Sequence, residues 1–453
     1  MGLLYGLFGS VVVGFFLDVL FVSSLAVPLG VIYLYKQLSY VEDWFFCSND
    51  MNSMLIFMTL SLTLVIFLSS KYFQYNLYNT VLLTLTIVLL GCFSVKDLLG
   101  FYILFESSLV PILVMVVAWG YQPERLSAGL YMITYTVLGS LPLLVIVLYL
   151  GAQVNSWSLY LLFQTPWVSN WAVSLGFLAF LVKLPIWVLH VWLPKAHVEA
   201  PLGGSMILAG VLLKLGGYGL YLYASCFSFT TQGWCYGLLV SLTLWGGFCA
   251  SVICLSQSDI KAMIAYSSIV HMSLVVVGLL TGTTWGFLCG LVTMVAHGWT
   301  SSALFLIAYI TYEKVGSRSF NYTKGMLTYY PILSAFWFVL VAVNMAAPPT
   351  INLVGELAAV PAAWFWSGSL VCVLGGIMFM SVGYNMFLYI KINHGAPSLL
   401  MSSSTGIRSH NMLVLAMHLL PLLFLLNLDL MSPYTVGCMN SNDFFGLQNQ
   451  GFM

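Results

Sequence analysis

Long apolar stretches separated by short polar segments make up almost the whole chain. Those long enough to cross a membrane fall at about residues 5–36, 53–70, 77–94, 98–118, 127–150, 172–193, 203–224, 234–255, 262–281, 285–310, 331–365, 368–391 and 411–430. The first has room for one long helix or two short ones. The pattern predicts an all-α polytopic membrane protein of roughly thirteen or fourteen transmembrane helices, with no soluble domain.

Positive charges occupy every second loop from residue 119 onward. They are Arg125, then Lys195, then Lys261, then the group Lys314, Arg318 and Lys324, and finally Lys391 with Arg408. The loops between them, near 151–171, 225–233, 282–284 and 366–368, contain neither lysine nor arginine. The positive-inside rule therefore predicts that the charged loops face the cytoplasm or matrix and that the tail from Met431 to Met453 lies on the opposite side.

Composition narrows the possible functions. Of the 453 residues 61% are hydrophobic and 6% charged, and 13 basic residues balance 13 acidic ones, so no basic surface for nucleic acid is expected. The 9 cysteines are scattered without a C-x-x-C pair and are expected to be packing residues. Because no Walker motif, GxGxxG, metal-site spacing or CxxCH is present, we expect no nucleotide, metal or redox cofactor in this chain.

Two of the predicted spans carry proline in their middle. Pro185 follows Lys183 by two residues, and Pro348 and Pro349 shortly precede Glu356. Proline breaks a helix and frees backbone carbonyls, which membranes tolerate only inside protein or along a wet cavity. Paired broken helices are typical of inverted repeats in transporters, although two incidental kinks would give the same pattern. We expect the base Lys183 and the acid Glu356 to occupy equivalent places in two halves.

Charged groups inside apolar spans are the strongest candidates for function. Glu106, Lys183 and Lys214 lie well within such spans, and Glu356 follows the second break. Each costs about 2.5–3.5 kcal/mol to insert, so a functional role is the default interpretation, while satisfied polar residues that hold helices together are the alternative. Burial disfavours the charged form of both acids and bases, so these groups are expected to exchange protons near neutral pH.

Histidines add candidates for a proton relay. His271 and His297 lie inside spans near several serines and threonines, and histidine titrates in the physiological range. His190 and His197 flank Pro194 at the end of a span, where loop hydrogen bonding is a better interpretation than metal ligation.

Several sequence blocks resemble one known family. They are YQPERLSAGLYMITYT, GSLPLL, KLPIWVLHVWLPKAHVEAPLGGSMILAGVLLKLGGYG, SDIKAMIAYSSIVHMSLVVVG, MVAHGWTSSALF and APPTINLVGEL. Together they resemble the antiporter-like membrane subunits of respiratory complex I, a family that includes the Mrp sodium/proton antiporters. The WLPKAHVEAP and LLKLGGYG elements, and glutamate at position 356, are most similar to its mitochondrially encoded subunit 4 branch. The resemblance covers about residues 96–356 and is weaker to residue 430, while the first ninety or so residues match only in hydropathy.

The resemblance implies a fold of two inverted five-helix repeats, each with a broken helix. One antiporter-like transmembrane domain would fill residues 1–453, with divergent helices over about 1–95, the repeat core over 96–391 and a C-terminal helix and tail over 392–453. By position, Glu106, Lys183, Lys214, His297 and Glu356 match the family's proton-transfer residues, Glu106 pairing with Lys183 and the other three passing protons onward.

The resemblance also implies partners and a place in the cell. The chain would lie in the mitochondrial inner membrane among the other membrane subunits of complex I, especially subunits 2 and 5, and in contact with lipid. NAD, FMN, iron-sulfur clusters and ubiquinone would belong to partner subunits, whose NADH oxidation and quinone reduction would drive proton translocation. Two alternatives are a cation/proton antiporter within an Mrp-like assembly and a purely structural membrane subunit.

Overall fold

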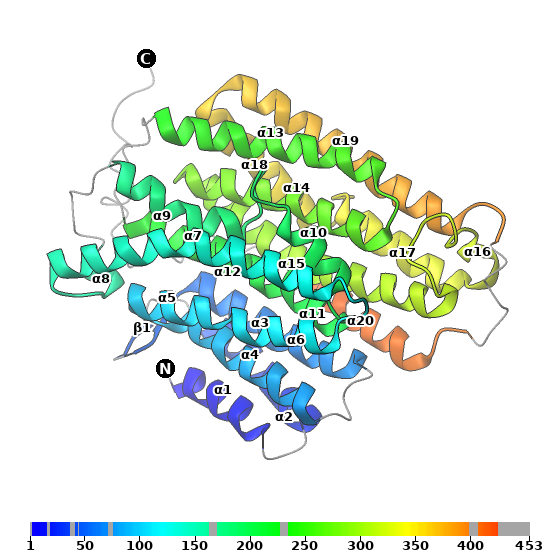
Figure 1. The fold of residues 1–453 in the computed structure, drawn as a ribbon, viewed down its shortest axis with the longest axis horizontal. Coiled ribbons are helices and arrows are strands. Elements are labelled where there is room, and N and C mark those ends of the chain that lie inside the picture. Colours follow the sequence, from blue (N-terminus) through cyan, green and yellow to red (C-terminus); the bar gives the residue numbers. More distant parts are fainter. Residues whose placement is uncertain are drawn as a thin grey trace.

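The chain folds as a bundle of long helices whose axes run in nearly the same direction (Figure 1). The computed structural model describes residues 2–15, 19–36, 41–43, 45–70, 76–162, 170–226, 234–397 and 406–424. The predicted tail at 431–453 lies outside the described residues. Nine helices in the described part are long and apolar enough to cross a membrane, and shorter apolar helices accompany them. This confirms the all-α polytopic membrane fold.

Each predicted span is occupied by one helix or by two or three consecutive helical segments. The N-terminal half contains α1 (Gly2–Val13), α2 (Val19–Lys36), α3 (Asp50–Ser69), α4 (Asn76–Ser94), α5 (Leu98–Ser107), α6 (Leu109–Trp119), α7 (Arg125–Val154), α8 (Leu159–Leu162), α9 (Asn170–Lys183) and α10 (Trp192–Glu199). The C-terminal half contains α11 (Leu202–Ile207), the π-helical turn η2 (Leu208–Leu212), α12 (Leu213–Cys226), α13 (Trp234–Ser256), α14 (Ile260–Leu280), α15 (Thr284–Val315), α16 (Met326–Tyr329), α17 (Pro331–Asn344), α18 (Ile351–Trp366), α19 (Gly368–Asn393) and α20 (Ser409–Phe424). The first apolar stretch therefore forms two helices, α1 and α2.

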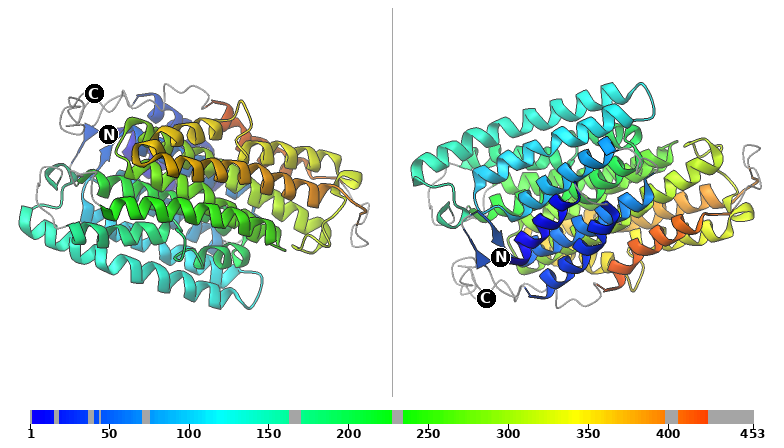
Figure 2. Two further views of the ribbon diagram at one scale, coloured as in Figure 1. Left: turned by 90° about the horizontal axis from the view of Figure 1, so that it is seen from above. Right: turned by 90° about the horizontal axis from the view of Figure 1, so that it is seen from below.

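The centre of the bundle is formed by α15, which packs against α14 and α18. The membrane-spanning window of α15 is 100% buried, whereas that of α19 is only 28% buried. Helices α1, α2 and α20 lie on the face of the bundle that is seen from below, and α13 and α19 lie side by side on the face that is seen from above (Figure 2). The spans of α12 and α15, which carry Lys214 and His297, are 94% and 100% buried, whereas the span that carries Glu106 is 39% buried.

An internal repeat is visible in two matching backbone bridges. Asp97 precedes α5 and pairs with Ser158, and Asp259 precedes α14 and pairs with Ser319. In each case the first residue of the helix donates its N–H across the bridge, from Leu98 to the Trp157 carbonyl at 2.9 Å and from Ile260 to the Arg318 carbonyl at 3.1 Å. Helix α7 links the two ends of the bundle at which these bridges lie. The segments that begin at α5 and at α14 therefore repeat the same local arrangement at opposite ends of the bundle.

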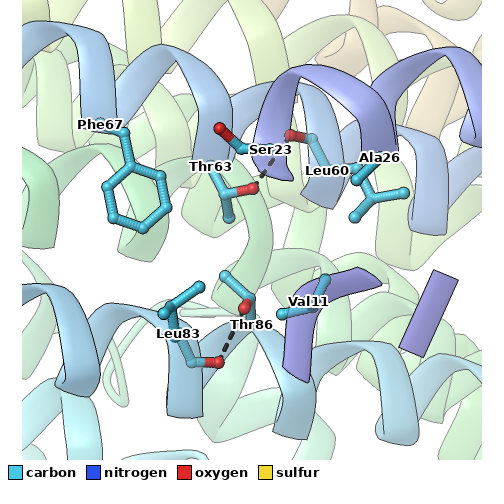
Figure 3. A pocket seen from close by; sticks show the side chains of 8 residues that line it. All are labelled: Val11, Ser23, Ala26, Leu60, Thr63, Phe67, Leu83 and Thr86. Atoms are coloured by element: carbon cyan, nitrogen blue, oxygen red, sulfur yellow. Dashed lines mark hydrogen bonds between the residues drawn. The ribbon is translucent and has the colours of Figure 1, made fainter. Parts of the chain in front are cut away.

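The N-terminal helices add features that hydropathy did not predict. Residues Val41–Glu42 (β1) and Cys47–Ser48 (β2) form a short antiparallel hairpin beside α1. A cavity among α1, α2, α3 and α4 is lined by Val11, Leu60, Phe67, Thr63 and Thr86 among others (Figure 3). Thr63 and Thr86 each donate to a carbonyl of their own helix, at 2.9 and 2.7 Å, so the cavity offers little for a polar ligand.

Candidate functional site

The first broken helix holds Lys183 as the last residue of α9. The break continues to α10, where the Trp192 indole N–H donates to the Val182 carbonyl at 3.0 Å and so satisfies one carbonyl that the break frees. The Lys183 side chain is 3% exposed. Its Nζ donates to the Phe105 carbonyl at 3.4 Å and lies 4.0 Å from the centre of the Phe105 ring. The ammonium is thereby held against α5.

Glu106 directly follows Phe105 in α5 and is half-buried. Its carboxylate lies beside Ser140 of α7 and interacts electrostatically with Lys183. Among the contacts of the described residues, no salt bridge within 4.0 Å joins Glu106 to Lys183, and one carboxylate oxygen of Glu106 is buried without a hydrogen-bond partner. The acid and the base thus occupy neighbouring helices in an open arrangement.

Lys214 lies in α12, directly after the π-helical turn at Leu208–Leu212, and is fully buried. Its Nζ donates to the Ala209 carbonyl at 2.6 Å and is 2.9 Å from Nδ1 of His297. A π-turn changes the normal helical pairing, and such turns recur at functional sites. Here a carbonyl within the turn serves as an acceptor for the buried ammonium.

Two glycines let α12 approach its neighbours closely. A Cβ at Gly216 would lie 3.0 Å from Cβ of Lys183 and 3.1 Å from the backbone nitrogen of Leu184. A Cβ at Gly217 would overlap the sulfur of Met294 in α15. The GGYG segment therefore places the Lys214 helix directly against the first break on one side and against α15 on the other.

A line of titratable side chains continues from Lys214 through the centre of the bundle. The rings of His297 in α15 and His271 in α14 lie 5.2 Å apart, centroid to centroid. His271 Nδ1 is in turn 4.0 Å from a carboxylate oxygen of Glu356 in α18. All four residues are at most 6% exposed. Sequence reasoning named His271 as a candidate but did not place it between His297 and Glu356, because its neighbours along the chain say nothing about which helices meet there.

The second broken helix repeats the construction of the first. Helix α17 ends at Asn344, and α18 begins at Ile351. The Asn352 side-chain amide donates to the Val343 carbonyl at 2.7 Å, as Trp192 does to Val182 in the first break. In both breaks, the second half-helix supplies a side-chain donor for the carbonyl one residue before the end of the first half-helix.

This correspondence corrects one expectation from the sequence. Lys183 and Glu356 do not occupy equivalent places: Lys183 ends a first half-helix, whereas Glu356 is the sixth residue of a second half-helix. The counterpart of Lys183 is Asn344, and the counterpart of Glu356 is His197, the sixth residue of α10. The two repeats share a backbone frame and differ in where the ionisable groups are attached.

The expected loop hydrogen bonding of His190 and His197 is also wrong for His197. That residue lies inside α10, is 0% exposed, and its ring stacks on Phe305 with centroids 4.6 Å apart. Within the described part of the chain, neither of its ring nitrogens has a hydrogen-bond partner. His190 stacks on Trp187 at 4.9 Å. No group of three or more possible metal ligands occurs among the described residues.

The positively charged loops gather at one end of the bundle, as their alternation predicted. Arg318 donates to Gln122 at 3.0 Å and pairs with Glu199 at 3.6 Å. Lys261 donates to the Val198 carbonyl at 3.5 Å. Loops that are far apart in the sequence therefore meet at this end.

Comparison with known proteins identifies the family. The profile of the family described as "NADH:quinone oxidoreductase/Mrp antiporter, TM" matches residues 95–382. The chain belongs to this family. The NADH-ubiquinone oxidoreductase chain 4 of Albinaria caerulea is 45% identical over 82% of this chain and 86% of its own length. The chain 4 of Ceratitis capitata is 44% identical over 78% of this chain and 79% of its own length.

Solved structures share the fold of this antiporter family at low sequence identity. A chain of respiratory complex I from Thermus thermophilus with bound NADH superposes with a TM-score of 0.87 at 22% identity, over 96% of this chain and 97% of that one. A chain of the Mrp complex from Dietzia sp. DQ12-45-1b gives a TM-score of 0.79 at 18% identity, over 96% of both chains.

Proposed function

We propose that this chain carries protons through the mitochondrial inner membrane as an antiporter-like subunit of NADH:ubiquinone oxidoreductase. The observation that carries the proposal is the line from Lys214 through His297 and His271 to Glu356, which four different helices bring together at the centre of the bundle. Ionisable side chains buried within the membrane are energetically costly, and a role in proton relay accounts for their presence there.

Lys183 and Glu106 form the proposed control of this relay. Two unit charges about 4 Å apart attract by roughly 4 kcal/mol at an effective dielectric of about 20. Closing the pair would hold the proton on Lys183, and opening it would favour release toward Lys214 because burial disfavours the ammonium. Moving one charge across 100 mV costs about 2.3 kcal/mol, so an interaction of this size is sufficient to gate one step.

Lys214, His297 and Glu356 are the proposed carriers that follow. The 2.9 Å contact between Lys214 Nζ and His297 Nδ1 is short enough for direct proton transfer when one of the two is neutral. His271 then bridges His297 to Glu356, the proposed terminal acid. The 4.0 Å distance from His271 to Glu356 requires either a small movement or one intervening water.

The energy for transport is proposed to come from other subunits. NADH oxidation and ubiquinone reduction, with NAD, FMN and iron-sulfur clusters, are assigned to those partners, and this chain acts as an enzyme only within the assembly. Its proposed neighbours are the antiporter-like subunits 2 and 5 and membrane lipid. Within the chain, we assign transport to the repeat core at 96–391, with the helices before residue 95 and the segment 392–453 as additions.

Glu356→Gln tests the proposal because it removes the acid while keeping the shape of the side chain. The assembled complex should lose at least about tenfold in proton transport per NADH oxidised, since a positioned acid–base group contributes about 10²–10⁴-fold. Glu356→Asp should be milder. Glu124→Gln, at an exposed acid before α7, is the matched control. Undiminished proton transport by Glu356→Gln in membrane vesicles of equal complex content would remove Glu356 from the path.

A further inference from the structure

A pair of buried asparagines joins the second broken helix to α19. The Asn344 Nδ2 group donates to Oδ1 of Asn385 at 2.9 Å, and Nδ2 of Asn385 donates to the Ser381 carbonyl at 2.9 Å. Both asparagines are 1% exposed. Helices α17 and α19, which carry the two asparagines, pack against each other. The proton-transfer line described above includes neither residue.

Asn344 lies at the end of α17, next to His271 of the proposed relay. It is the last residue of α17, and its backbone contacts His271. His271 lies 4.0 Å from Glu356, beyond the length of an ordinary hydrogen bond. Because the end of α17 adjoins His271, a shift of about one ångström there would be enough to change whether His271 and Glu356 are within transfer distance.

The asparagine pair is a poor choice if packing is its only role. Oδ1 of Asn344 is buried, and among the described residues it has no hydrogen-bond partner, which is unfavourable inside a protein. An apolar pair would fill the space without that cost. The bond to Asn385 is directional, however, and it fixes the end of a helix that the break leaves without continuous backbone hydrogen bonding.

We propose that Asn385 is a positioning residue: by holding Asn344, it fixes the end of α17 and with it the His271 ring that faces Glu356. This inference rests on the proposed function of the relay. In the first half of the chain, Lys183 stands at the position that corresponds to Asn344, and its ammonium group, the proposed proton carrier, donates to the Phe105 carbonyl. The second half uses a neutral amide at that place, so its role is to hold the helix and not to carry charge.

The chain offers a closely matched control in the same helix. Asn393 also lies in α19, is also 1% exposed and also donates to the carbonyl four residues earlier, Tyr389, at 3.1 Å. Asn385→Leu should lower proton transport per NADH by about three- to tenfold, the effect of losing one buried hydrogen bond at a rate-determining geometry. Asn393→Leu should leave it unchanged. Asn385→Asp, which keeps an oxygen to accept from Asn344, should restore most of the transport.

The pH profile separates positioning from mere structural damage. With complex content equal on native gels, Asn385→Leu should move the pH at which transport is half-maximal, because the distance between His271 and Glu356 changes, while Asn393→Leu should not. If Asn385→Leu does not assemble, the comparison of Asn385→Ala with Asn393→Ala takes its place. Equal transport and equal pH profiles in the 385 and 393 variants would overturn the inference, provided that Glu356→Gln is impaired. If Glu356→Gln itself transports normally, the proposed function is what fails.

Discussion

The two inverted halves of the chain have the same backbone plan but different chemistry. In the half that begins at α5, a half-helix ends at Lys183, and the acid Glu106 lies eight residues after the first residue of α5. In the half that begins at α14, the corresponding places are held by Asn344 and Ser268. Both breaks are closed by the same type of side-chain bond, so the break itself is structural. Under the proposed function, proton transfer depends on which residues are attached to it.

The ionisable residues of the second half lie at different positions along their helices from those of the first half. His271 lies on α14 nearly one turn beyond Ser268, and Glu356 lies within the second half-helix instead of at the end of the first. These shifts bring both residues to the end of the line that starts at Lys214. Under the proposed function, Glu106 and Lys183 of the first half control the relay, and His271, His297 and Glu356 of the second half carry its later steps.

The largest effect is expected from Lys183→Ala, which removes the ionisable group that distinguishes the first break from the second. Removing the ammonium should lower coupled proton transport by about a hundredfold, as expected for the loss of a positioned acid–base group. Lys195→Ala is the matched control, since this exposed lysine lies in α10, beyond the same break, with its Nζ over the Tyr131 ring. Transport is measured as acidification of membrane vesicles driven by NADH. Comparable losses in the two variants would show that Lys183 has no special role.

A smaller effect is expected at Gly216, which tests the contact between the first break and the Lys214 helix. A Cβ added at this position would lie 3.0 Å from Cβ of Lys183, so Gly216→Ala should force α12 and the break apart at a cost of about 1–3 kcal/mol. We expect a lower thermal stability of the assembled complex and partial loss of transport. Gly237→Ala, in α13 with nothing within 4 Å of its added Cβ, should change neither. An unchanged Gly216→Ala variant would mean that this close approach is not required.

Much of the fold could be predicted because hydropathy and proline act locally. The span at 98–118 became α5 and α6, and Pro185 and the Pro348–Pro349 pair marked both breaks correctly. The alternation of lysine and arginine also identified which loops meet at one end. Each of these signals lies within a few residues of the feature that it predicts.

The remaining features depend on contacts between distant segments. The π-turn lies in the apolar run LAGVL, which carries no local signal, and its role becomes visible only when the Ala209 carbonyl is seen to accept from Lys214. The step through His271 depends on α14 packing against both α15 and α18. The sequence did not reveal that Asn344 is the counterpart of Lys183, because the spacing between this residue and the following proline differs between the two breaks. Which of the ionisable residues carry protons remains a prediction.

The central claim is that Glu106 and Lys183 act as one switch, and a double-mutant cycle tests it most directly. Glu106→Gln, Lys183→Ala and the double variant are compared as coupled quinone reduction and proton transport in membranes with equal complex content. Both single variants should be impaired. Lys183→Ala should be at least as severe as Glu106→Gln, because Lys183→Ala removes the group that carries the proton, whereas Glu106→Gln removes only the charge that controls the proton affinity of Lys183. The account predicts that the double variant is no worse than the worse single variant, since both changes act on one element. Strictly additive losses would contradict it, because they would show that the two residues work independently.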